Sequence, residues 1–268
     1  REGADAAERG GQRIGAAPDA HHAAGGGPEI ARPGGLEAGD LRAEHPPVAG
    51  KHPKHGRVDA LLLGRVEARR GGLVVRHAIW GITPHIREFS ESLAEHGYEG
   101  FAPNLLDSAD VPWPELYTEP AILDQRMALG EQAGWGAACV PRVQAAIDAL
   151  EGPVFVMGFC FGGTTAWLSA TRAHGVTAVS AFYGGDIVRY RDETPKVPTI
   201  LHLGKADELI PPPDVEAIRA AHPDLPVFMY DAGHAFVAPN GHHEDSARLS
   251  RLRTLAHFSR NSGVRAES

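Results

Sequence analysis

The sequence has few of the features that cross-link a chain or anchor it in a membrane. Its two cysteines, Cys139 and Cys160, are too few for a disulfide framework, and a free thiol suits a reducing compartment. No stretch approaches the roughly 20 apolar residues that span a bilayer. The first residues also lack the apolar centre of a secretory signal. We therefore expect a cytoplasmic protein with no membrane partner.

Positive charge and metal-binding patterns are also scarce. The chain of 268 residues carries a net charge of −8, which argues against the basic face that binds nucleic acid. Its 15 histidines are scattered, and they stand next to one another only at His21-His22 and His242-His243. The cysteines do not have the spacing of a metal site. We expect no metal, no cofactor and no nucleic-acid partner.

Aromatic residues are missing from the start of the chain. The sequence has 18 of them, and the first is Trp80. A segment with so little bulky apolar surface cannot offset the entropy lost on ordering, so we predict that residues 1–56 are disordered. Their Gly-, Ala-, Pro- and Arg-rich composition also resembles GC-rich DNA translated out of frame, which leaves open whether residues 1–71 are native. We assign residues 57–262 to one domain and residues 263–268 to a tail.

From residue 72 onward, short apolar runs alternate with helical periodicity. Such alternation predicts a mostly parallel sheet with helices on both faces and an active site at the carboxyl ends of the strands. We expect strands at 72–76, 98–102, 153–157, 176–183, 198–203 and 226–230, with one more available from 58–66. We expect helices at 84–96, 121–150 with a break at 134–136, 162–174, 213–221 and 244–259.

The motif Gly158-Phe-Cys-Phe-Gly-Gly163 directly follows one of these strands. It matches the nucleophile elbow, a sharp strand-to-helix turn that needs glycine on either side of the nucleophile. The turn would lift Cys160 above the sheet edge, where helix N–H groups can hold an oxyanion and the helix dipole favours thiolate. Taken alone the motif is weak, since a lone cysteine beside an apolar strand is usually a buried hydrophobe.

Two later strand ends carry the partners that such a nucleophile needs. Asp207 lies in Gly204-Lys-Ala-Asp207, and His234 lies in Gly233-His-Ala-Phe236. In isolation they would be a turn former and a loop histidine, and Glu208 competes as the acid. Together they give the α/β-hydrolase order of nucleophile, acid and histidine. In that arrangement His234 takes the thiol proton, and Asp207 fixes the tautomer of the imidazole.

With Ile79-Trp-Gly-Ile-Thr-Pro-His-Ile-Arg87 and Phe182-Tyr-Gly184, these motifs resemble the dienelactone hydrolase family over residues 72–260. The resemblance implies an α/β-hydrolase fold and a carboxymethylenebutenolidase-like enzyme that cleaves a lactone or small ester through a thioester. It implies an oxyanion hole from the backbone N–H groups of Ile79 and Phe161. It also implies that Trp80 and Tyr183 lie beside the substrate, although Tyr183 is open to a second interpretation as a core aromatic. The oligomeric state, monomer or homodimer, stays open.

The sequence also departs from the family pattern. Ala78 occupies the place of a family glutamate thought to help activate the thiol, and strand alternation turns the neighbouring His77 to the other face. The family's substrate-binding arginines have no match after Phe236 or in 105–120. The usual first strands are atypical or missing, which would leave a sheet edge unpaired. The alternatives are a catalytically impaired scaffold that binds a small ligand or partner, and a thiol redox sensor using Cys139.

Overall fold

The computed structural model describes residues 51–52, 56–57, 60–63, 69–106 and 120–263. All of these belong to a compact unit that spans His45–Ser268. Almost all of the predicted disordered segment 1–56 and of the tail 263–268 lies outside the described residues. The division of the chain into 1–56, 57–262 and 263–268 therefore stays a prediction.

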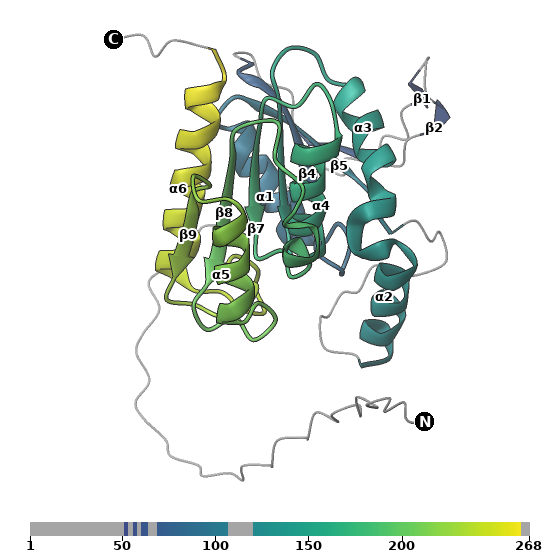
Figure 1. Ribbon diagram of the computed structural model, residues 1–268. Coiled ribbons are helices and arrows are strands. Elements are labelled where there is room, and N and C mark those ends of the chain that lie inside the picture. Colours follow the sequence, from purple (N-terminus) through teal and green to yellow (C-terminus); the bar gives the residue numbers. More distant parts are fainter. Residues whose placement is uncertain (1–50, 53–55, 58–59, 64–68, 107–119, 264–268) are drawn as a thin grey trace, which may run out of the picture. The chain divides into compact units, whose positions relative to one another are not determined.

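One seven-stranded sheet forms the centre of the molecule (Figure 1). Its strand order is β3-β5-β4-β6-β7-β8-β9, and all neighbours run parallel except β3, which is antiparallel to β5. Strands β4, β6, β7 and β8 are buried along their whole length, as expected of apolar strands covered on both faces. The strands are β3 Ala60–Leu63, β4 Gly71–Arg76, β5 Tyr98–Pro103, β6 Val154–Phe159, β7 Ala178–Phe182, β8 Thr199–Gly204 and β9 Val227–Tyr230.

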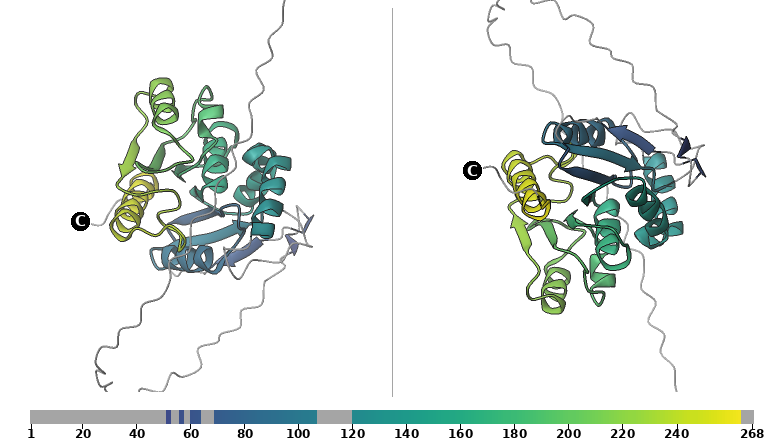
Figure 2. Two further views of the ribbon diagram at one scale, coloured as in Figure 1. Left: turned by 90° about the horizontal axis from the view of Figure 1, so that it is seen from below. Right: turned by 90° about the horizontal axis from the view of Figure 1, so that it is seen from above.

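The helices cover both faces of this sheet (Figure 2). Helices α1 and α6 share one face, where Phe258 of α6 packs on Phe155 of β6 and Arg251 lies 5.4 Å from the ring centroid of Phe89 in α1. Helices α3, α4 and α5 cover the other face. The helices are α1 Pro84–Ala94, α2 Pro120–Gln132, α3 Val140–Asp148, α4 Phe161–Arg172, α5 Pro212–Ala221 and α6 Glu244–Asn261, with 3₁₀ turns η1 Gly134–Cys139 and η2 Ile187–Tyr190.

The predicted α/β fold is confirmed, including the break in the long helical region. The break falls in η1, where Trp135 and Gly136 have φ values of 49° and 110°. Strand β5 ends at Pro103, which has no N–H to extend a ladder. Parallel register brings the ends of β6, β8 and β9 to one edge, with Gly204 of β8 opposite Tyr230 of β9. The loops that follow these three strands therefore meet there.

The N-terminal edge of the sheet differs from our expectation. The residues 58–66 do supply a strand, β3, which pairs with β5 from Ala60↔Pro103 to Leu63↔Gly100 and covers the edge we expected to be unpaired. The antiparallel pair β1 (Lys51–His52) and β2 (Gly56–Arg57) had no signal in the sequence, because two backbone pairs need no particular side chains.

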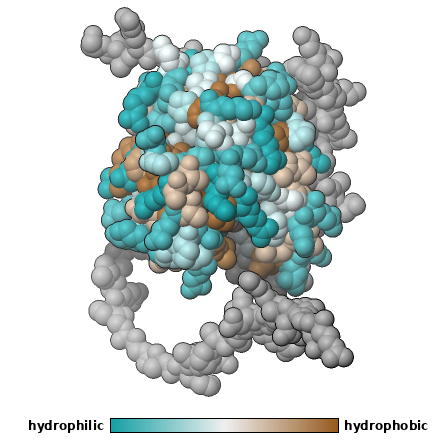
Figure 3. All heavy atoms as spheres, viewed as in Figure 1, coloured by the Kyte–Doolittle hydropathy of each residue, from teal (hydrophilic) through white to brown (hydrophobic). Residues whose placement is uncertain are grey.

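The surface carries no sign of a membrane-spanning segment in the part that the structure describes. No helix among the described residues combines the length and apolar character needed to cross a bilayer. On the face drawn in Figure 3, hydrophobic residues appear in small groups between hydrophilic ones.

Candidate active site

Cys160 occupies a sharp turn between β6 and α4. It has φ 53° and ψ −115°, a conformation that L-residues rarely adopt. Its N–H donates to the carbonyl of Phe182 at 3.0 Å, and its own carbonyl accepts from the N–H of Thr164 at 3.1 Å. The strained strand-to-helix turn expected from the sequence is therefore present.

The two glycines that flank the turn are required by close backbone packing. A Cβ atom on Gly158 would collide with the carbonyl oxygen of Gly162. A Cβ atom on Gly162 would lie 2.5 Å from the carbonyl oxygen of His77, at the end of β4. The elbow thus rests directly on the neighbouring strand, and no larger residue fits at either position.

Asp207 and His234 come together from the loops after β8 and β9. Nδ1 of His234 donates to Oδ2 of Asp207 at 2.8 Å. The Asp207 side chain is fully buried, and its Oδ1 accepts the N–H of Leu209 at 2.9 Å. Both carboxylate oxygens are therefore engaged, which holds the proton of a neutral imidazole on Nδ1 and leaves Nε2 as the proton acceptor.

Cys160 interacts with the other side of the His234 ring. Burial lowers the pKa of His234, but hydrogen bonding to Asp207 and Cys160, together with their negative charge, outweighs burial and raises the pKa to about 10. Nε2 is buried and has no well-formed hydrogen bond to any described residue. Nε2 is therefore the ring nitrogen of His234 that is left to exchange a proton on the side of Cys160.

Two cavities meet at Cys160 and His234. The smaller has a volume of about 60 Å³ and includes Ala78 and Tyr183 in its wall, and the larger has a volume of about 480 Å³ and includes Ile79 and Phe161. Trp80 lines both. The structure thus brings together all the residues that the sequence suggested for this site: Cys160, Asp207, His234, Ile79, Phe161, Trp80 and Tyr183.

Ile79 and Phe161 line the larger cavity together with Cys160. Phe161 is the first residue of α4, and N–H groups in the first turn of a helix have no intrahelical acceptor. Ile79 follows β4 and belongs to the turn in which the Gly81 N–H donates to the Ala78 carbonyl at 3.1 Å. This arrangement suits an oxyanion between the two segments.

Tyr183 lies both in the wall of the smaller cavity and in the hydrophobic core, and its contact with substrate stays a prediction. Its side chain is buried, and its ring packs edge-on against the His234 ring with centroids 5.0 Å apart. It also contacts Phe159 and Phe236 in the core. Its φ of 36° places it in a strained turn at the end of β7.

The structure also shows the surroundings of Ala78 and His77, where the sequence departs from the family pattern. Ala78 presents a methyl group to the small cavity beside Cys160. His77 is fully buried, and its ring bonds to the Leu105 N–H at 2.9 Å and to the Ala78 carbonyl at 2.6 Å. It is therefore committed to the backbone and cannot replace a carboxylate at the thiol.

Cys139, the alternative redox partner, is buried elsewhere. Its thiol donates to the carbonyl of Leu105 at 3.4 Å, and burial raises its pKa. It lines neither of the two cavities at Cys160. Among the described residues, no group of three or more His, Cys, Asp or Glu side chains is arranged to hold a metal ion.

Several cavity residues were not found from the sequence. His85 lies in the small cavity, and burial followed by the charge of His242 lowers its pKa to about 4. Asp186 and Arg189 line the large cavity as an ion pair with a distance of 2.8 Å. His85 follows the Trp80-Gly81 motif so closely that the sequence could have suggested it as a site residue. The other two lie in and beside the short turn η2, which has no periodic signal.

A parallel sheet with this elbow at a central strand end defines an α/β hydrolase. The model of the dienelactone hydrolase family matches residues 58–262. The chain belongs to that family, as the sequence motifs predicted.

Curated relatives and solved structures agree with this assignment. The chain is 30% identical over 240 residues to a putative carboxymethylenebutenolidase from Salmonella typhimurium, covering 79% of this chain and 86% of the relative. It is 28% identical over 201 residues to the carboxymethylenebutenolidase of Pseudomonas putida, covering 68% and 83%. A putative dienelactone hydrolase from Klebsiella pneumoniae superposes with a TM-score of 0.62 at 25% identity, covering 77% and 94%.

Proposed function

We propose that this chain hydrolyses a lactone or small carboxylic ester through a thioester on Cys160. The observation that carries the proposal is the position of His234, bonded to Asp207 on one side and acting on the Cys160 sulfur on the other. Membership of the dienelactone hydrolase family supports ester or lactone cleavage. The names of the relatives from Salmonella typhimurium and Pseudomonas putida point to the same reaction.

The thiolate of Cys160 attacks the ester carbonyl carbon, and the carbonyl electron pair moves onto oxygen. The backbone N–H groups of Ile79 and Phe161 hold that oxyanion, an effect that typically lowers a barrier by about 3 kcal/mol per donor. Collapse of the intermediate breaks the bond to the alcohol oxygen, which takes a proton from Nε2 of His234. A water then gives a proton to Nε2 and attacks the thioester, which releases the acid and restores the thiolate.

His234 and Cys160 stabilise each other as an ion pair. The negative sulfur helps to raise the pKa of His234 to about 10, and by reciprocity the imidazolium stabilises the thiolate. An imidazolium beside the sulfur favours the thiolate, although position 78 carries no carboxylate. Asp207 keeps the ring oriented through both steps.

The test is ester hydrolysis by Cys160→Ala and Cys160→Ser, with Cys139→Ala as the matched control thiol. We expect Cys160→Ala to lose at least about 10³-fold in kcat/KM for p-nitrophenyl acetate and for a dienelactone, because the covalent route is gone. Cys139→Ala should keep wild-type turnover if it folds. Wild-type turnover in Cys160→Ala would show that Cys160 is not the nucleophile.

The rival function, a scaffold without catalysis, is favoured by Ala78. Thiol alkylation separates the two. A working Cys160 should react with iodoacetamide well below pH 8, because the His234 imidazolium persists to about pH 10. Alkylation like that of a free cysteine, together with no hydrolysis of either ester, would favour the scaffold.

The proposal also covers the compartment in which the protein works and the partners that it binds. A working free thiol fits a reducing cytoplasm, with a small molecule as the only substrate and neither nucleic acid nor membrane as a partner. We also expect residues 57–268 expressed alone to match the full chain in solubility and esterase activity. Loss of activity in the shorter chain would assign a role to residues 1–56.

A further inference from the structure

The two cavities at Cys160 differ greatly in size. The larger, at about 480 Å³, falls within the range of roughly 300–1,000 Å³ typical of small-molecule sites. The smaller, at about 60 Å³, falls well below that range. The site can therefore hold one small and one large substituent of an ester carbonyl.

The wall of the larger cavity is apolar and open to solvent. Leu123 and Met127 on α2 are 39% and 44% exposed, and Leu209 after β8 is 62% exposed. Large apolar side chains seldom gather in the open without a role in binding. Covering them with an apolar substituent would stabilise the complex in proportion to the area removed from water.

The charges on this wall do not suit an anionic substrate. Arg189 is the only cationic side chain among the described lining residues apart from His234, and its Nε lies 2.8 Å from Oδ1 of Asp186. Asp214 adds a second carboxylate. The positive charge of His234 is already matched by Cys160 and Asp207. A substrate carboxylate would therefore meet a wall with more negative than positive charge.

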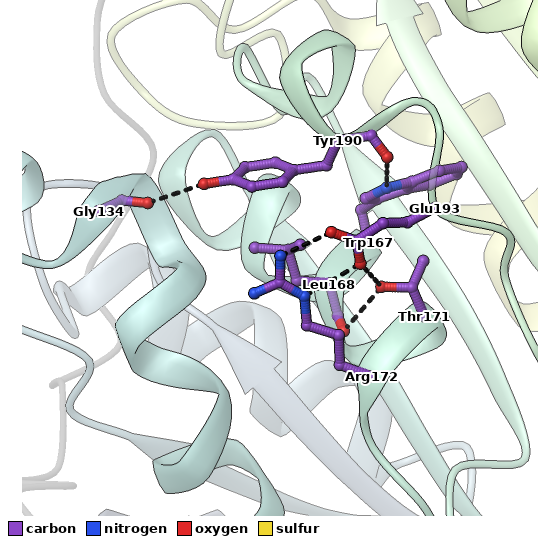
Figure 4. Close-up of polar contacts among 7 residues, drawn as sticks. All are labelled: Gly134, Trp167, Leu168, Thr171, Arg172, Tyr190 and Glu193. Carbon is purple, nitrogen blue, oxygen red and sulfur yellow. Dashed lines mark hydrogen bonds and ion pairs between the residues drawn. The ribbon is translucent and has the colours of Figure 1, made fainter.

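Hydrogen bonds hold two sides of this cavity together (Figure 4). The hydroxyl of Tyr190 in η2 donates to the Gly134 carbonyl in η1 at 3.1 Å, and the Tyr190 carbonyl accepts from Trp167 of α4 at 3.2 Å. Arg172 of α4 donates to both carboxylate oxygens of Glu193, at 2.6 and 3.0 Å. The turn η2, which carries Arg189, is therefore bonded both to η1, which carries Trp135, and to α4.

We infer that this enzyme prefers esters with one small substituent and one larger substituent that is apolar and uncharged, and that it discriminates against substrates carrying a carboxylate. The inference rests on the hydrolase function proposed above and names its substrate class. The residues that set the preference are Leu123, Met127 and Leu209, with Asp186 holding Arg189.

A pair of esters whose larger groups differ mainly in charge tests the inference. In 4-acetoxybenzoate the larger group carries a carboxylate, and in methyl 4-acetoxybenzoate the same group is neutral. We expect the wild-type enzyme to favour the neutral ester by at least about tenfold in kcat/KM, with both rates corrected for hydrolysis in buffer and for active thiol counted by iodoacetamide.

The variant Met127→Arg adds a positive charge to the wall of the larger cavity. It should reduce the preference for the neutral ester about fivefold, as expected of a charge at roughly 8 Å in a half-exposed site. The matched control is Leu252→Arg in α6, where the leucine is 52% exposed and lines neither cavity. Comparing each variant with the wild type cancels the different reactivities of the two leaving groups.

Each outcome bears on one proposal. Hydrolysis of the two esters within twofold of each other, or equal preferences in Met127→Arg and Leu252→Arg, would overturn the substrate preference and leave the hydrolase function intact. Cleavage of neither ester by the wild type would refute the hydrolase function and this inference with it. Undiminished cleavage by Cys160→Ala would refute the role of Cys160 and, with it, a substrate preference set by the cavity at Cys160.

Discussion

The substitution His77→Asn tests a buried histidine that ties the end of β4 to the loop after β5. Nε2 of His77 accepts the N–H of Leu105 at 2.9 Å, so the proton of the neutral ring lies on Nδ1, which donates to the Ala78 carbonyl. An asparagine amide can still donate to the Ala78 carbonyl, but it is too short to accept the N–H of Leu105. At pH 7.5 the variant should be less stable by about 1–2 kcal/mol, the usual effect of leaving one buried donor unpaired.

Acid should remove that difference. Burial, followed in size by the Arg126 and Arg76 charges, lowers the pKa of His77 from 6.5 to about 4 against the opposing bond to the Ala78 carbonyl. Because the unfolded chain binds the proton first, the stability contributed by the neutral ring is complete above pH 6.5 and falls as the pH drops toward 4. At pH 5 the wild type should have lost about 2 kcal/mol from this one group.

The measurement is urea unfolding of both proteins at pH 7.5 and pH 5. His85, His202 and His257 also have lowered pKa values, but they titrate in both proteins and cancel in the difference. The gap in the free energy of unfolding should shrink by about 2 kcal/mol between the two pH values. A gap that does not change with pH would refute the assignment of a neutral, acid-sensitive His77.

Other substitutions test the elbow, the thiol and the cavity wall. Gly158→Ala should unfold the domain or lose about 3 kcal/mol or more of stability, because its Cβ would collide with Gly162, whereas Gly185→Ala, with 3.9 Å to its nearest neighbour, should change stability by less than about 1 kcal/mol in thermal melts. Ala78→Glu should slow iodoacetamide labelling at pH 7 about tenfold, because a carboxylate beside the sulfur opposes the thiolate; an unchanged rate would contradict this. Tyr190→Phe should lose about 1 kcal/mol of stability with its bond to η1, and equal stability in urea would show that the bond contributes nothing.

The strands and the elbow could be predicted because their causes are local in the sequence. Each buried strand is a short apolar run, and Gly158 is needed by its contact with Gly162 inside the elbow, although Gly162 itself is needed by contacts with Arg76 and His77 of the neighbouring strand end. Asp207 and His234 were predictable for a different reason. Parallel strands end at one edge, so the residues that follow β8 and β9 meet the residue that follows β6.

The cavity wall could not be predicted in the same way. Leu123 and Met127 belong to α2, while Leu209 follows β8 and Arg189 lies in η2. Their meeting depends on how three separate segments pack, and none of the three carries a motif that points to this cavity. The strand β3 was harder to predict than the other strands. Its apolar run is short, and only its pairing with β5 shows that it belongs to the sheet.

Ala78 gives the active site a simpler electrostatic balance than a carboxylate would. With a methyl group at that position, the groups of described residues known to act on the Cys160 sulfur are the His234 imidazole and the first turn of α4. Both favour the thiolate, and no neighbouring carboxylate competes for the imidazolium except Asp207, which is buried on the far side of the ring. Under the proposed mechanism Cys160 needs no charged substrate to become a nucleophile, which agrees with a large cavity whose described wall is mostly apolar and in which Arg189 is paired with Asp186.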